Sequence, residues 1–121
     1  MTPTTINLDQ LKAMTGDDVS IMKEFIKMYL KDTPNLMEKI LLAKSQEIYI
    51  GEESVAWGCH KMAPQLSYMG INKGFELVKN IEGKLKELNG TTYSELNHQL
   101  DELKQLCEMS YVELNHFIEA N

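Results

Sequence analysis

The sequence predicts an all-α protein, built as an antiparallel up-down four-helix bundle with two short N-terminal helices that cap it. From Leu8 onward, apolar residues recur at spacings of three and four, which is the repeat of one helix face. No stretch alternates strictly between apolar and polar residues, as a half-buried strand would. The breaks between the helical segments are short, and short connections place successive helices antiparallel.

The two short helices are expected at residues 8–15 and about 19–31. Gly16 and the aspartates after it end the first helix and cap the second. Pro34 is expected to stop the second helix, because proline lacks the N–H of a helix interior and clashes with the preceding turn. The buried face expected for this helix consists of Ile21, Phe25, Met28 and Tyr29.

Four longer helices are expected to form the bundle, over residues 34–46, 52–68, 72–88 and about 91–118. Pro34 suits the first turn of a helix, where its missing N–H costs nothing. Gly70 suits the end of the helix that precedes it. The apolar residues of that preceding helix form a narrow seam, with spacings of four and three: Val55, Cys59, Met62, Leu66 and Met69.

The bulk composition is that of an ordinary globular domain, with 121 residues, 43% hydrophobic and 25% charged. We expect residues 1–121 to form a single domain, with residues 1–6 flexible. A net charge of -6 repels nucleic acid and anionic membranes, so neither is an expected partner. The first five residues carry no basic side chain, and no apolar segment follows them, so we expect no signal peptide and a cytoplasmic location.

Several classes of enzyme lose support because their sequence motifs are missing. The chain has no His-Glu-x-x-His zinc motif, no phosphate-binding Gly-x-x-x-x-Gly-Lys loop and no Gly-x-Ser-x-Gly elbow. No ATP-binding or kinase motif is present either, and we expect no bound metal or cofactor. His98 and His116 would lie about 27 Å apart along one helix, too far to share a metal ion. Cys59 and Cys107 fall on apolar helix positions and are expected to be reduced core residues.

His60 is the residue with the clearest chemical potential. It lies one position, about 100°, from the buried seam of its helix, so its ring reaches solvent. An unperturbed imidazole has a pKa of about 6.5, so it is largely neutral at cytoplasmic pH and offers a lone pair for nucleophilic attack. Glu82, on the following helix, is our candidate to accept the N–H of the other ring nitrogen and orient the ring. The surrounding face carries small or compact residues: Ala56, Ala63, Pro64 and Ser67.

The run His60-Lys61-Met62-Ala63-Pro64-Gln65-Leu66-Ser67-Tyr68-Met69-Gly70 resembles the signature of histidine-containing phosphotransfer (Hpt) domains. Five positions match that signature in place: His60, Lys61, Met62, Met69 and Gly70. Residues 8–17, Phe25 and residues 30–34 resemble the leading helices of the family, and Ile81-Glu82 resembles its aliphatic-acidic pair. The resemblance covers about residues 6–88.

The resemblance implies that His60 accepts a phosphoryl group from the phospho-aspartate of a receiver domain and passes it to another receiver. The partners it implies are receiver (response-regulator) domains and a hybrid sensor histidine kinase. Mg²⁺ would come from the receiver. Such a protein is a phosphocarrier in a two-component phosphorelay rather than a free-standing enzyme, and we expect it to be a monomer.

Two positions depart from the family pattern: Ala63 stands where a lysine is usual, and Pro64 where a glycine is usual. Lys61 and Lys79 are therefore candidates to lie near the phosphoryl group. The surface expected to dock the partner consists of Ala56, Trp57, Ala63, Pro64 and Ser67. The departures keep an alternative open, a helical adaptor that docks receiver or kinase domains without taking phosphate. A purely structural helical domain is a further alternative, because a histidine on a helix surface is often unreactive.

Overall fold

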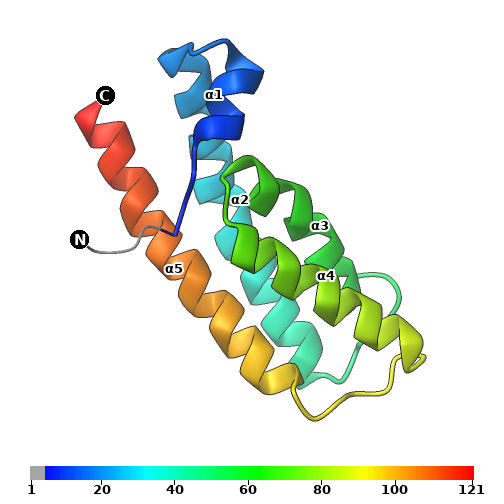
Figure 1. The fold of residues 1–121 in the computed structure, drawn as a ribbon. Coiled ribbons are helices and arrows are strands. Elements are labelled where there is room, and N and C mark those ends of the chain that lie inside the picture. The colour runs from blue at the N-terminus through cyan, green and yellow to red at the C-terminus, as the bar shows by residue number, and fades with distance from the viewer. Residues whose placement is uncertain (1–4) are drawn as a thin grey trace.

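The computed structural model describes residues 5–121, and this part of the chain is all-helical, with no strand among the described residues (Figure 1). The all-α prediction is confirmed. The helices are α1 (Asp9–Thr15), α2 (Val19–Ser45), α3 (Val55–Tyr68), α4 (Asn72–Glu87) and α5 (Leu96–Ala120).

The long helix α2 corrects the prediction of two short leading helices. The segments expected at 19–31 and 34–46 form one helix of 27 residues, with Pro34 in its interior, so α1 is the one short leading helix among the described residues. An internal proline costs about 3 kcal/mol or more, but the buried face continues through it without a change of phase. This face consists of Met22, Ile26, Tyr29, Thr33, Met37, Ile40 and Ala43.

The buried face of the first half of α2 is also displaced from the expected one. Ile21 and Met28 are 44% and 59% exposed, whereas Met22 and Ile26 are buried. Apolar residues occupy both sides of this helix, so spacing alone fits two faces that differ by one position. Tyr29 is buried as expected, with its hydroxyl 2.8 Å from Ser110 Oγ of α5, and packing in the core selects Met22 and Ile26 as its neighbours on the buried face.

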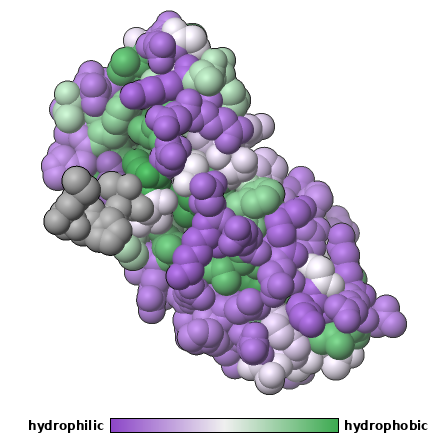
Figure 2. Space-filling view, in the orientation of Figure 1, coloured by the Kyte–Doolittle hydropathy of each residue, from purple (hydrophilic) through white to green (hydrophobic). Residues whose placement is uncertain are grey.

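The four longer helices lie side by side (Figure 1). α3 packs against α2 and α4, α5 packs against the same two helices, and α1 packs against α2. Their contacts enclose a single core, and the face of the molecule seen in Figure 2 is mostly hydrophilic. Gly58 permits the close approach of α3 to α2, because a Cβ at this position would overlap the side chain of Ile40.

The ends of the helices follow the local chemistry of the chain. α3 begins at Val55, three residues later than predicted, because Gly51 and Glu53 adopt positive φ angles of 102° and 53°. Ser54 then caps the helix, with its Oγ accepting the N–H of Trp57 at 3.1 Å. Gly70, with φ 67°, follows the other end of α3, as expected for a helix stop.

The N-terminal segment crosses from α5 to the end of α3. The N–H of Thr5 donates to the carboxylate of Glu113 at 2.8 Å, and the N–H of Asn7 donates to the carbonyl of Met69 at 3.1 Å. Of the segment 1–6, which was expected to be flexible, residues 1–4 lie outside the described residues. Across residues 5–121, no helix combines the length and the apolar character needed to cross a membrane.

Candidate functional site

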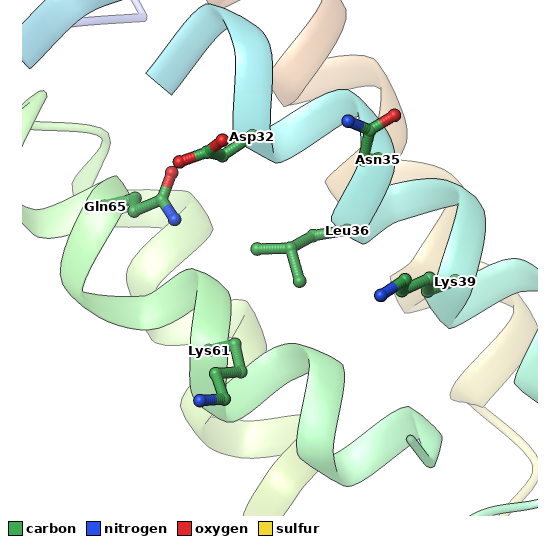
Figure 3. A pocket seen from close by; sticks show the side chains of 6 residues that line it. All are labelled: Asp32, Asn35, Leu36, Lys39, Lys61 and Gln65. Carbon is green, nitrogen blue, oxygen red and sulfur yellow. The ribbon is translucent and has the colours of Figure 1, made fainter. Parts of the chain in front are cut away.

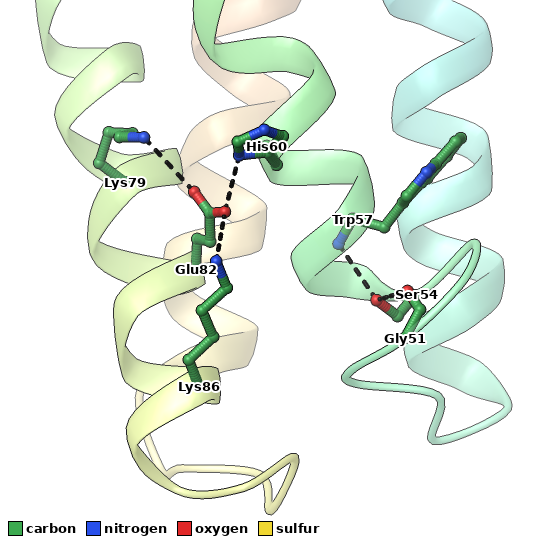
Figure 4. A network of polar contacts seen from close by, with 7 residues as sticks. All are labelled: Gly51, Ser54, Trp57, His60, Lys79, Glu82 and Lys86. Atoms are coloured by element: carbon green, nitrogen blue, oxygen red, sulfur yellow. Dashed lines mark hydrogen bonds and ion pairs between the residues drawn. The ribbon is translucent and has the colours of Figure 1, made fainter.

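The exposed imidazole of His60 lies on α3, facing α4. Its side chain is 66% exposed, although the preceding residue, Cys59, is fully buried. The ring nitrogen Nδ1 lies 2.8 Å from Oε2 of Glu82 on α4 (Figure 4). The structure therefore brings together the two residues that the sequence singled out as nucleophile and orienting carboxylate.

Glu82 is the only buried carboxylate of the described residues, and both of its oxygens have a hydrogen-bond or ion-pair partner. Beside His60 it contacts two lysines of its own helix: Lys86 Nζ lies 3.1 Å from Oε2, and Lys79 Nζ lies 3.5 Å from Oε1. A buried carboxylate without partners would cost several kcal/mol. These contacts offset that cost and hold both oxygens in place beneath the ring.

The charge state of Glu82 fixes the tautomer of the histidine. Burial alone raises the pKa of this carboxyl, but hydrogen bonds from Lys86 and His60, together with their positive charges, lower the pKa below its ordinary value. Glu82 is therefore ionised at neutral pH. An ionised carboxylate only accepts hydrogen bonds. A neutral imidazole therefore carries its single N–H proton on Nδ1, facing Glu82, and its lone pair on Nε2.

An open hollow of about 210 Å³ lies beside the ring. The hydroxyl of Ser54 fixes the loop at its edge, since it donates to the carbonyl of Gly51 at 2.7 Å and accepts from the N–H of Trp57 (Figure 4). The hollow is lined by Ile50, Gly51, Ser54, Ala56, Trp57, His60, Glu82 and Lys86.

The two lysines proposed from the sequence have different positions. Lys79 belongs to the site through its ion pair with Glu82. Lys61 does not, because its Nζ lies 5.7 Å from the centre of the Trp57 ring, and the residue lines a separate hollow between α2 and α3 (Figure 3). On a helix, consecutive residues point about 100° apart, so sequence adjacency to His60 does not bring Lys61 to the ring.

The five residues expected to dock a partner differ in exposure. Ala56 and Ala63 are buried, with 5% and 4% of their surface exposed, so they shape the base of this face and add little contact area. Trp57 and Ser67 are half-buried, and Pro64 is exposed. The accessible part of the face therefore comes from His60, Pro64 and the exposed portions of Trp57 and Ser67.

Lys86 is the residue of the site that was not predicted from the sequence. The signal was available in its spacing, since residues four apart on a helix are neighbours and Glu82 precedes Lys86 by four. Below the ring, burial and the charge of Glu82 raise the pKa of the Cys59 thiol to about 12, so this cysteine is an inert core residue.

Within residues 5–121, no three His, Cys, Asp or Glu side chains lie close enough together to hold a metal ion. His98 and His116 are exposed on α5. Comparison of the chain with protein-family models, curated proteins and solved structures found no match.

Proposed function

We propose that this protein is a histidine phosphotransfer module of a two-component phosphorelay. His60 accepts a phosphoryl group from the phospho-aspartate of one receiver domain and passes it to another. The observation that carries the proposal is the contact of 2.8 Å between Nδ1 and the buried Glu82. It supports the proposal because it orients an exposed imidazole with its nucleophilic nitrogen available to a partner.

In the proposed reaction, the Nε2 lone pair of His60 attacks phosphorus. The bond between phosphorus and the aspartyl oxygen breaks, and the aspartate leaves as a carboxylate. The proton on Nδ1 stays in its hydrogen bond to Glu82, which stabilises the positive charge that develops on the ring. The receiver supplies Mg²⁺ and most of the remaining catalytic groups, and this chain binds no cofactor of its own.

We also propose how the helices are arranged and which partners the protein binds. The cycle of packing contacts among α2, α3, α4 and α5 supports an antiparallel up-down four-helix bundle. We assign docking to the face around the ring, and we propose a cytoplasmic monomer whose partners are receiver domains and a hybrid sensor histidine kinase.

The test is phosphoryl transfer from a receiver that carries a radiolabelled phospho-aspartate. The wild-type chain should take up label that is lost in acid and kept in base, as expected for a phosphoramidate bond. His60→Gln should take up none. His98→Gln, a matched change on the exposed surface of α5, should behave like the wild type. Equal labelling of His60→Gln would refute the proposal.

A second candidate is an adaptor that docks a receiver without taking phosphate. Ala63 and Pro64 favour it, because they stand where the family usually has a lysine and a glycine, and the alanine supplies no cation at its position. The same experiment separates the two candidates, since an adaptor would bind the phosphorylated receiver and leave the label on it.

A further inference from the structure

Lys86 is the lysine that shares a carboxylate oxygen with the imidazole of His60. Its Nζ and the Nδ1 of His60 are both within hydrogen-bond distance of one atom, Oε2 of Glu82, at 3.1 and 2.8 Å. Lys86 also lines the hollow beside the ring, whereas Lys79 and Lys61 do not. Lys79 contacts the other carboxylate oxygen, at 3.5 Å.

The surroundings of Lys86 leave its ammonium group free to move. Its side chain is 64% exposed, and helical side chains lean toward the N-terminal end of their helix, here toward the turn that contains Gly83. A Cβ at Gly83 would meet nothing within 4 Å, and the glycine adds no side chain of its own. The open hollow beside the ring, which Lys86 helps to line, gives the ammonium group room to move next to His60.

The charges around the ring favour an anion. The carboxylate of Glu82 carries one negative charge, and Lys79 and Lys86 carry two positive charges. One positive charge is thus in excess beside His60, in a chain whose net charge is -6. A phosphoryl group carries about -1.5 to -2 at neutral pH, so its arrival on the ring would attract the more mobile of the two ammonium groups.

We propose that Lys86 binds the phosphoryl group while His60 carries it, an inference that rests on the proposed function. On phosphorylation, the ammonium group leaves Oε2 and donates to a phosphoryl oxygen. Oε2 then accepts from Nδ1–H alone, at the stage when the ring bears more positive charge. Lys79 stays on Oε1 and keeps the carboxylate in place. Lys86 is the binding residue in this scheme, and Lys79 is a positioning residue.

The test uses phosphoramidate, a small donor that phosphorylates histidine without a receiver. Nε2 attacks phosphorus, the P–N bond of the donor breaks and ammonia leaves. The pKa of the phosphoryl group on the full-length chain is then read from the pH dependence of its ³¹P chemical shift. Because a nearby ammonium group favours the dianion, Lys86→Gln should raise this pKa by about one unit. Lys86→Arg keeps the cation and should restore most of the wild-type value.

Lys84→Gln is the matched control, since it removes the same charge from an exposed position of the same helix, and it should titrate like the wild type. A purely structural role for Lys86 would change the unfolding curve and leave the phosphoryl pKa unaltered. Normal labelling of His60 with an unchanged phosphoryl pKa in Lys86→Gln would overturn this inference alone. A wild-type chain that takes no phosphoryl group on His60, from phosphoramidate or from the phosphorylated receiver, would overturn the proposed function as well.

Discussion

Glu82 shows how one buried side chain organises the chemistry of an exposed one. The carboxylate lies in the contact between α3 and α4, and it accepts from the imidazole on one side and from two lysines on the other. Because it is ionised and fixed, it sets the tautomer of His60 and the direction of the free lone pair. The reactivity proposed for the histidine is thus a property of a group of residues on two helices.

The lowered pKa of Glu82 predicts how stability depends on pH. A carboxyl whose pKa is lower in the folded than in the unfolded state stabilises the fold above the unfolded value of about 4.3. That stabilisation is lost as the pH falls through the folded value. Glu82→Gln cannot ionise, so its free energy of unfolding should fall less steeply than that of the wild type between pH 5 and the acid limit of folding, as measured by urea unfolding. Parallel pH profiles of the two proteins would show that Glu82 contributes no such linkage.

The sequence predicted three residues of the site, His60, Glu82 and Lys79, and missed a fourth, Lys86. His60 and Glu82 stand next to strongly apolar residues, Cys59 and Ile81, so each could be placed at the edge of a buried seam. α4 carries several exposed lysines, and the spacing of four residues places Lys86, but not Lys84, beside Glu82. Lys61 was proposed because of its nearness in sequence, but its ammonium group lies against Trp57 instead.

At the scale of helices, two prolines show where local sequence signals fail. Pro34 and Pro64 both lie inside helices, yet the sequence predicted a stop at the first and continuation through the second. At both positions the proline lacks an N–H and its ring crowds the preceding turn of the helix. The helix continues through the proline when the buried residues before and after it lie on the same helix face. In α2 they do, and Thr33 adds a hydrogen bond from its hydroxyl to the carbonyl of Tyr29 at 2.6 Å.

Two glycines inside helices should respond oppositely to the same substitution. Gly83→Ala should stabilise the protein by about 0.5–1 kcal/mol, because alanine loses less backbone entropy and its Cβ would meet no neighbour. Gly58→Ala should destabilise it by about 1–3 kcal/mol, because the new Cβ would force α3 away from Ile40. Urea unfolding of both variants measures the difference. Changes of the same sign would contradict the packing described for α2 and α3.

For the whole molecule, periodicity predicted the helical class and most helix ends, but it could not show which helices pack together. Those contacts join residues far apart in the chain, such as the hydroxyls of Tyr29 and Ser110 and the N-terminal segment with Glu113. Net charge is equally uninformative about the site. The chain is acidic overall, while the surroundings of His60 carry an excess positive charge from Lys79 and Lys86.

NMR can show whether His60 carries the phosphoryl group on the nitrogen turned away from Glu82. The measurement is the coupling between ³¹P and ¹⁵N in a chain whose histidines are ¹⁵N-labelled, after phosphorylation by a receiver. We expect a single phosphorus signal coupled to Nε2 of His60, with a proton retained on Nδ1. Phosphorus coupled to Nδ1, or to a nitrogen of His98 or His116, would show that His60 does not carry the group in this way, and so would a chain that receives no phosphorus at all.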